Sequence, residues 1–178
     1  MLFNENYITR GCWCMYWRIK RSLFNKQQGK ANKRAMKKLI VSGEVPGILA
    51  YHNDYPVGWC SVAPREVFST LERSHTLRRV DDQPVWSIVC FYIAKKYQHE
   101  GIMALLIKAA ISYAKRNGAR IVEAYPLIPE KSKSPKWEAY TGIITTFRRL
   151  GFKKVLQRSR IRPIMRYYIG KARGKGQK

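Results

Sequence analysis

The stretch YIAKKYQHEGIMALLIKAAISYAKR, residues 92–116, determines the fold that we expect for the whole chain. Its first residues end an apolar segment, residues 85–94, whose β-branched and aromatic composition predicts a buried strand. A polar turn with a single glycine, Gly101, comes next. Apolar residues then recur with helical spacing at Ile102, Leu105, Leu106, Ala109, Ala110 and Tyr113. The stretch therefore predicts a strand, a turn and a helix in direct succession.

The turn in front of this helix is a potential anion-binding site. The first amides of a helix lack partners within the helix, and the helix dipole adds partial positive charge at that end. Gly101 lets the backbone approach an anion without an intervening side chain, and Gln98 and His99 add donors. A plain strand-to-helix turn has the same pattern, so the turn alone leaves both interpretations open.

The segments on either side predict a mixed α/β domain. Residues 119–126, ARIVEAYP, are expected to form a strand parallel to residues 85–94, because a helix connects the two. Further strands are predicted in pairs at 47–65 and at 152–170, and further helices at 30–44, 65–74 and about 141–150. We expect one domain over residues 1–170 and a basic, disordered tail over residues 171–178.

The charge of the chain is strongly unbalanced. Thirty-five Lys and Arg residues against eleven Asp and Glu residues give a net charge of +24. Such a field attracts nucleic acid, phosphorylated ligands or anionic membranes, although an ordinary basic protein surface would give the same composition. Residues 85–94, the longest apolar segment, are too few to span a bilayer, and MLFNENYITR at the N-terminus lacks a signal-peptide pattern. We therefore expect a cytoplasmic protein that does not enter a membrane.

Residues 91–126 resemble motif A of the GCN5-related N-acetyltransferase (GNAT) superfamily, a strand followed by Gln/Arg-x-x-Gly-x-Gly/Ala and a helix. Gln98 and Gly101 match this motif, whereas Met103 departs from its last small residue and Ala104 comes just beyond. FRRLGFKKV resembles the end of motif B, Tyr-x-x-x-Gly-Phe, with Phe147 in place of the tyrosine. The segments GCWCMYWR, GWCSVAPR, VWSIVCFYI, AYTG and RPIMR together resemble one bacterial subfamily of mostly unassigned substrate.

The resemblance implies a GNAT fold, an α/β (α+β) domain with a mixed central sheet of about six to seven strands flanked by helices. It also implies that the two central parallel strands splay apart. The activity it implies is acetyl transfer from acetyl-CoA to a primary amine of a small molecule or peptide, by a monomer or homodimer. Two alternatives are a basic nucleic-acid-associated protein and an acetyltransferase whose amine is carried on RNA, such as aminoacyl-tRNA. The implied acetyl-CoA contacts are Phe91, Tyr92 and Ile93 for the pantetheine arm, and Gln98, His99, Glu100, Gly101, Ile102, Met103 and Ala104 for the pyrophosphate.

The resemblance leaves the catalytic acid open, because Phe147 cannot donate the proton that the family's tyrosine supplies. Tyr140 and Tyr125 are the nearest phenols, although a buried tyrosine is more often a packing residue whose hydroxyl is satisfied. Glu123 is the candidate base, since a desolvated carboxylate inside the apolar strand RIVEAYP would accept a proton more readily. The alternative for Glu123 is a structural ion pair with an arginine.

The segment GCWCMYWR, residues 11–18, is a candidate for the acceptor pocket. If it is extended, Trp13 and Trp17 share one face and form an aromatic wall, with Arg18 available for an anionic group. Equally, the two tryptophans would only close the core. Cys12, Cys14, Cys60 and Cys90 are expected to be reduced thiols, and the absence of Cys-x-x-Cys or His-x-x-x-His spacing predicts no metal site.

Overall fold

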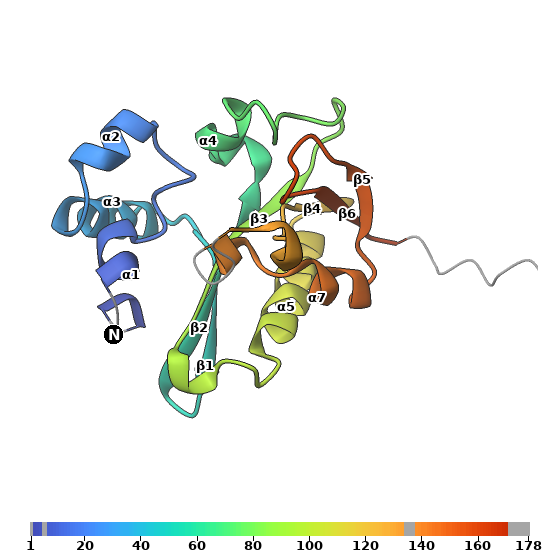
Figure 1. Ribbon diagram of the computed structural model, residues 1–178. Helices are drawn as coiled ribbons and strands as arrows, with labels where there is room; N and C mark the ends of the chain where they lie inside the picture. The colour runs from blue at the N-terminus through green and yellow to red at the C-terminus, as the bar shows by residue number, and fades with distance from the viewer. Residues whose placement is uncertain (1, 5–6, 134–137, 171–178) are drawn as a thin grey trace, which may run out of the picture.

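The computed structural model describes residues 2–4, 7–133 and 138–170, and all statements on structure below refer to these ranges. Their centre is a six-stranded sheet in the order β1-β2-β3-β4-β6-β5 (Figure 1). The strands are β1 Ile48–His52, β2 Tyr55–Pro64, β3 Trp86–Ile93, β4 Ile121–Ala124, β5 Lys153–Leu156 and β6 Ile164–Tyr168. Only β3 and β4 pair in parallel, so the sheet is mixed, as predicted. The predicted tail, residues 171–178, lies outside the described ranges.

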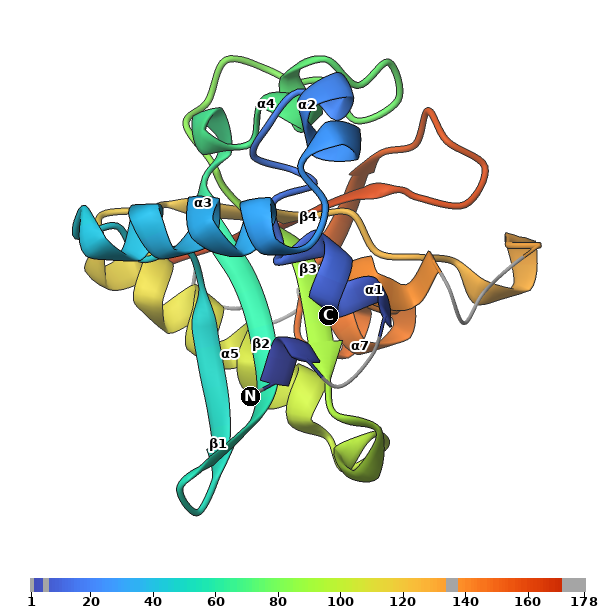
Figure 2. The ribbon, with the colours of Figure 1, turned by 90° about the vertical axis from the view of Figure 1, so that its left-hand side faces the viewer.

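Helices cover both faces of the sheet. α5 and α7 lie on one face, and α1, α2 and α3 lie on the other (Figures 1 and 2). The helices are α1 Tyr7–Cys12, α2 Arg21–Lys26, α3 Lys30–Val41, α4 Ser69–Glu72, α5 Ile102–Arg116 and α7 Ile144–Arg149. Short 3₁₀ turns η1 Leu2–Asn4, η2 Arg65–Val67, η3 Lys95–Tyr97, η4 Pro129–Lys131 and η5 Ala139–Thr141 connect them.

The face under α5 is packed by apolar side chains. α5 buries Leu106, Ile107, Ala110 and Ala114 against the sheet. The helix approaches β2 closely at Gly58, where a Cβ would lie 3.0 Å from a methyl group of Ile102. The buried face of α5 differs from the predicted one by about one residue. Leu105 and Ala109 were predicted to be buried, but Leu105 is 61% exposed and Ala109 is also exposed.

The two parallel strands separate halfway along β3. Their pairing covers only Trp86–Val122, Ser87–Glu123 and Ile88–Ala124. On its other edge, β3 pairs with β2, and the register of that pairing shifts just after Ile88. Val62 pairs with Ile88, but the preceding residue, Ser61, pairs with Cys90. Val89 is thus the extra residue of a β-bulge, a feature that bends and twists a strand. Beyond β4 the chain turns aside and bridges Leu127 to Ile143. This is the splay that the resemblance predicts.

The N-terminal segment differs from its predicted form. α1 ends at Cys12, and Trp13 and Cys14 both have left-handed backbones, with φ of 45° and 56°. Residues 11–18 are therefore a helix end followed by turns, and the predicted alternation of faces does not occur. Trp13 and Cys14 are both buried, in a cluster that also contains Trp59. The segment is not extended because a tight turn brings Cys14 beneath Trp59. Trp13 and Cys14 adopt left-handed backbones in this turn, and the sequence has no glycine at either position that would have indicated it.

Candidate active site

The turn between β3 and α5 presents a row of unpaired backbone donors. Within the described ranges the amides of residues 99–103 donate to no protein acceptor, whereas those of Ala104 and Leu105 both donate to the carbonyl of Gly101. His99 and Gly101 have left-handed backbones, with φ of 70° and 78°. A Cβ at Gly101 would meet no atom within 4 Å, so the approach to these amides is open. The turn thus has the donors and the space that an anion requires.

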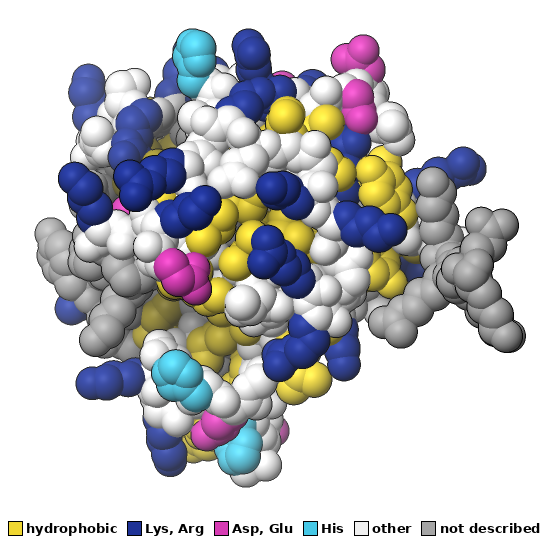
Figure 3. Space-filling view, turned by 45° about the vertical axis from the view of Figure 1, so that its right-hand side comes forward, with side chains coloured by type: hydrophobic (Ala, Val, Ile, Leu, Met, Phe, Trp, Pro, Cys, Tyr) yellow, Lys and Arg dark blue, Asp and Glu magenta, His cyan; other side chains and the backbone are white. Residues whose placement is uncertain are grey.

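The side chains of this turn lie away from the donors. Gln98 Nε2 donates to the carbonyl of Ile93 at 3.1 Å and ties the turn to the end of β3. Met103 is half-buried and packs against the core beneath α5. His99 and Glu100 are exposed. In Figure 3, hydrophobic side chains gather in the middle of one face of the molecule, and Lys and Arg side chains surround them.

The end of β3 lies beside the segment that precedes α7. η5 contacts β3 on the side from which β4 has departed. Gly142 follows η5 with φ of 83°, and a Cβ there would lie 2.6 Å from the ring of Phe147 and 3.2 Å from that of Phe91. Glycine is therefore required at position 142. The rings of Phe91 and Phe147 are 6.1 Å apart, and both residues are buried.

Tyr140, within η5, is the phenol that lies at the splay. Its ring centroid is 6.4 Å from those of Tyr16 and Trp17. The guanidinium of Arg162 lies 5.2 Å from the ring and also donates to the Thr141 hydroxyl and the Glu138 carbonyl. Burial raises the pKa of Tyr140, so its hydroxyl keeps its proton at neutral pH.

Glu123, on β4, and Tyr125, just beyond it, belong to a buried polar network. Glu123 accepts hydrogen bonds from Arg65 at 3.0 Å, from Arg166 at 2.8 Å and from the Tyr125 hydroxyl at 2.7 Å. The Tyr125 hydroxyl also accepts from Arg65 and meets Ser87 at 2.9 Å. Burial, and then the adjacent Glu123, raise the pKa of Tyr125. These contacts favour the ion-pair alternative for Glu123 and the packing alternative for Tyr125.

The three residues predicted for the acceptor pocket do not come together. Trp17 lies beside Tyr140, and in the described part of the chain its indole N–H has no partner. Trp13 instead packs on Phe3, with ring centroids 5.4 Å apart. Arg18 turns toward the Pro46 carbonyl, to which it donates at 2.9 Å. The structure therefore joins Trp17 to the splay and separates Trp13 and Arg18 from it.

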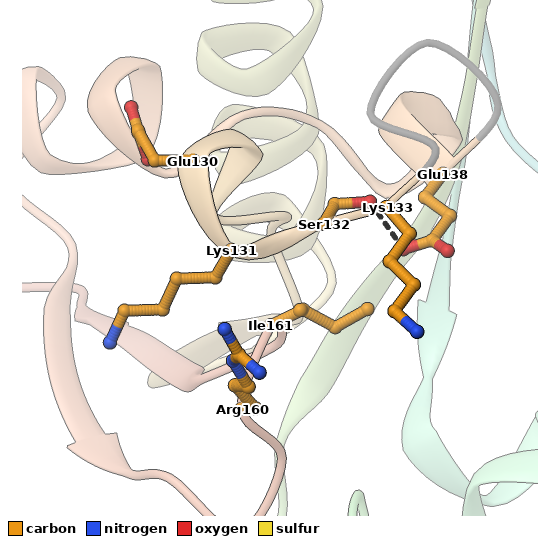
Figure 4. Close-up of a pocket in the computed structure, with 7 residues that line it drawn as sticks. All are labelled: Glu130, Lys131, Ser132, Lys133, Glu138, Arg160 and Ile161. Carbon is orange, nitrogen blue, oxygen red and sulfur yellow. Dashed lines mark hydrogen bonds between the residues drawn. The ribbon is translucent and has the colours of Figure 1, made fainter.

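A shallow polar cavity of about 470 Å³ lies between η4 and the loop in front of β6 (Figure 4). Ser132 and Glu138 are hydrogen-bonded across it at 3.0 Å. The full lining is Glu130, Lys131, Ser132, Lys133, Glu138, Arg160 and Ile161. None of the residues predicted for a site lines this cavity.

The family model described as "Acetyltransferase (GNAT) family" matches residues 13–130. The chain belongs to this family. It is therefore an N-acetyltransferase, and the splayed six-stranded sheet is its GNAT fold. No curated protein matches the chain in sequence.

Solved GNAT structures share this fold at low sequence identity. A ribosomal-protein-alanine N-acetyltransferase from Brucella melitensis is 14% identical, with a TM-score of 0.52 over 88% of this chain and 90% of that chain. The PaiA N-acetyltransferase from Thermoplasma acidophilum, in complex with coenzyme A, is 12% identical, with a TM-score of 0.51 over 88% of this chain and 84% of that chain. Among the described residues, no helix is long and apolar enough to cross a membrane, and no three metal-ligating side chains could hold an ion together.

Several residues of this GNAT domain were not predicted for any role. Arg65 and Arg166 bind Glu123, Ser87 meets Tyr125, and Arg162 covers Tyr140. Each belongs to one of the segments GWCSVAPR, VWSIVCFYI, AYTG and RPIMR, or contacts a residue that does. The available signal was the resemblance of these separate segments, taken together, to one bacterial subfamily.

Proposed function

We propose that the protein transfers an acetyl group from acetyl-CoA to a primary amine, and that the turn at residues 98–104 holds the pyrophosphate. The unpaired amides of residues 99–103, beside the open face of Gly101, carry this proposal. They supply hydrogen-bond donors and the positive end of the α5 dipole at one place. Met103, the departure from the family motif, packs against the core and leaves this approach open.

The strand segment Phe91–Tyr92–Ile93 is proposed to position the pantetheine arm and the thioester. Pairing with β4 ends at Ile88, so the edge of this part of β3 that points away from β2 faces the splay. Backbone donors aimed at a developing oxyanion would stabilise it without reorganisation during the reaction.

Tyr140 is proposed as the acid that protonates the departing thiolate. It lies at the splay and keeps its proton, whereas the hydroxyl of Tyr125 is already held by Arg65, Glu123 and Ser87. Glu123, bound by two guanidinium groups, is proposed to support the sheet. Trp17 is proposed to line the entry of the amine, with its indole N–H available to an acceptor oxygen.

A thermal-shift titration with acetyl-CoA, followed by measurement of thiol release over a panel of amines, tests the proposal. Ligand at one hundred times its Kd would stabilise the fold by about 2.7 kcal/mol. Stabilisation by acetyl-CoA and thiol release with at least one amine are expected. Absence of any shift at millimolar acetyl-CoA would refute the assignment of the turn.

The outer surface of α2 and α3 favours one alternative acceptor, an amine carried on RNA. Between residues 20 and 43 the sequence contains no acidic residue. The exposed cations there are Lys20, Arg21, Lys26, Lys30, Lys33, Arg34, Lys37 and Lys38, and no ion pair within the described residues involves them. Figure 2 shows both helices in front of the sheet, on the outside of the molecule. Binding of a single-stranded RNA should fall steeply with salt if this surface is used, and a shallow dependence would exclude it.

A further inference from the structure

Three of the four cysteines, Cys12, Cys14 and Cys90, belong to or pack against the apolar cluster that contains Trp59. Cys14 is buried, and its sulfur accepts a hydrogen bond from the Trp59 indole N–H at 3.1 Å. Cys90 lies on β3 and packs against the same cluster, where its thiol lowers the pKa of Cys14. Cys90 is half-buried, and its sulfur lies 3.8 Å from the carbonyl oxygen of Phe91. The proposed acetyl transfer uses neither thiol.

Arg18 gives this cluster a buried positive charge. Its side chain is only 9% exposed, its Nε has no partner, and no carboxylate in the described ranges forms an ion pair with it. Only two acidic groups act on it electrostatically, Cys14 and the exposed Glu44. A buried guanidinium without a nearby anion is costly. A thiolate at Cys14 would supply that anion inside the cluster.

The surroundings distinguish Cys14 from the other three thiols. The hydrogen bond from Cys90 lowers the pKa of Cys14 to about 7 against the effect of burial, and Trp59, Arg18 and Ser61 act in the same direction. Burial raises the pKa of Cys12 to about 11 and also raises that of Cys60. The donated hydrogen bond and burial raise the pKa of Cys90. At neutral pH the cluster therefore holds one nucleophilic sulfur beside a protonated neighbour.

The backbone at this point is held in an unfavourable conformation. Trp13 and Cys14 are consecutive non-glycine residues with positive φ, which is uncommon even for one residue. Such conformations persist where surrounding contacts enforce them, and they concentrate at functional sites. Here the residue in this conformation accepts the hydrogen bond of the Trp59 indole on its sulfur.

We propose that Cys14 and Cys90 form a redox-active pair that reduces a hydroperoxide and becomes a reversible disulfide. The Cys14 thiolate attacks the peroxide oxygen, the O–O bond breaks, and Cys14 becomes a sulfenic acid while hydroxide or alkoxide leaves and is protonated. The Cys90 sulfur then attacks the Cys14 sulfur, the S–O bond breaks, and water leaves. In total, two thiols and one hydroperoxide give one disulfide, one water and a second water or an alcohol.

The same contacts predict that this disulfide is easily reduced. Arg18, Trp59 and Ser61 stabilise the thiolate of Cys14, and a disulfide whose reduced form is stabilised is a stronger oxidant. Small thiols should therefore restore the pair. Because the test measures thiol oxidation and not acetyl transfer, its outcome does not depend on the proposed function.

Hydrogen peroxide added to the reduced full-length protein tests the pair. Free thiols are then alkylated, the protein is digested with trypsin without reduction, and linked peptides are identified by mass spectrometry. Cys12 and Cys14 share one tryptic peptide, residues 11–18, so the experiment is repeated with Cys12→Ser. A Cys14–Cys90 link is expected in both proteins, and dithiothreitol should remove it. A link through Cys12 or Cys60, or none, would overturn the proposal.

Variants separate the roles of the two sulfurs. In Cys90→Ser, dimedone should trap a sulfenic acid at Cys14. In Cys14→Ser, Cys90 should stay alkylatable after peroxide. A sulfenic acid at Cys90 in Cys14→Ser would contradict the assignment.

The Trp59 hydrogen bond provides a quantitative check. Trp59→Phe keeps the ring but removes the donor, so oxidation of Cys14 should slow by about tenfold, the value of a hydrogen bond to a charged group. Trp86→Phe is the matched control, because Trp86 packs on Tyr113 in the other core cluster, away from Cys14. In the unaltered protein, the rate should rise with pH through about 7 as Cys14 loses its proton. Equal oxidation rates in the two variants, or an oxidation rate that does not change with pH, would contradict the proposal that Cys14 reacts as a thiolate.

Discussion

The two faces of the sheet are built from different kinds of contact. The face beneath α5 and α7 is packed by a large apolar cluster, which includes Leu106, Ile107 and Phe147. The opposite face buries charged and polar groups, including Arg65, Glu123 and the thiol of Cys14. One face is held by packing, which many sequences can supply, and the other by pairings that need particular residues.

This difference separates what the protein shares with its family from what is particular to it. The turn and α5 make up the GNAT motif and carry the proposed acetyl-CoA contacts. Arg65, Glu123 and Cys14 contribute to the opposite face. If the proposed function holds, the contrast predicts that backbone geometry recognises the cofactor, and that individually specified side chains select the acceptor.

The largest expected effect comes from removing a charge on the polar face. Arg65→Ala should lower the free energy of unfolding by about 3–5 kcal/mol, because it leaves Glu123 buried with one cation fewer. Arg79→Ala is the control, since the side chain of Arg79 is 34% exposed and its pairs with Glu66 and Glu72 should contribute at most about 1 kcal/mol. Urea denaturation measures the free energy of unfolding of both variants. Similar decreases would contradict the difference that we expect between the buried and the exposed ion pairs.

The two phenols should respond in opposite ways. Tyr140→Phe is expected to lower kcat by about 100-fold, as loss of a general acid does, with stability nearly unchanged. Tyr125→Phe should lower stability by about 1–3 kcal/mol and leave the kcat of folded protein intact, because its hydroxyl only joins buried partners. Steady-state kinetics and unfolding of both variants test this, and a kcat loss in Tyr125→Phe alone would exchange their roles.

The glycines at the two ends of α5 form a matched pair. Gly101 and Gly118 have φ of 78° and 81°, and a Cβ at either would meet nothing within 4 Å. Alanine should therefore destabilise the fold at both positions by about 1 kcal/mol. Only Gly101→Ala should weaken the binding of acetyl-CoA, by about tenfold in Kd, since the added Cβ would lie where the pyrophosphate approaches. Calorimetric titration with acetyl-CoA measures the affinity of both variants. Equal affinities would contradict the assignment of the anion site to the turn.

The smallest expected effect is that of Glu123→Gln on turnover. If Glu123 only supports the sheet, kcat per folded molecule should stay within about a factor of two, although stability falls. If Glu123 were a general base, its substitution would lower kcat by about 100-fold or more. Rates corrected for the folded fraction measure this, and a loss of the larger size would restore the predicted catalytic role.

Local patterns predicted most of the α5 face. The composition of residues 85–94 and the spacing in residues 102–116 identified β3 and α5, and Gly101 was placed at the start of the helix. The exposed position of Leu105 was missed, because periodicity fixes the helix but leaves its rotation against the sheet uncertain. Residues 53–54 were correctly placed between β1 and β2.

The polar face could not be predicted in the same way. Arg65 and Glu123 are 58 positions apart, and the chain offers many other arginines as partners. Cys14 and Cys90 meet only because a turn with two left-handed residues folds the N-terminal segment over β3. Such contacts depend on the completed fold, so the sequence supplied candidates such as Tyr140 without showing which of them lies at the splay.

The position of Gly142 has a consequence for position 147. Phe147, Phe91 and Gly142 fill one another's space so closely that Phe147 is fully enclosed. Restoring the family's tyrosine at position 147 would add a hydroxyl with no room and no partner, at a cost of about 1–3 kcal/mol. A phenol at position 147 would therefore need a second change that opens the loop at residue 142.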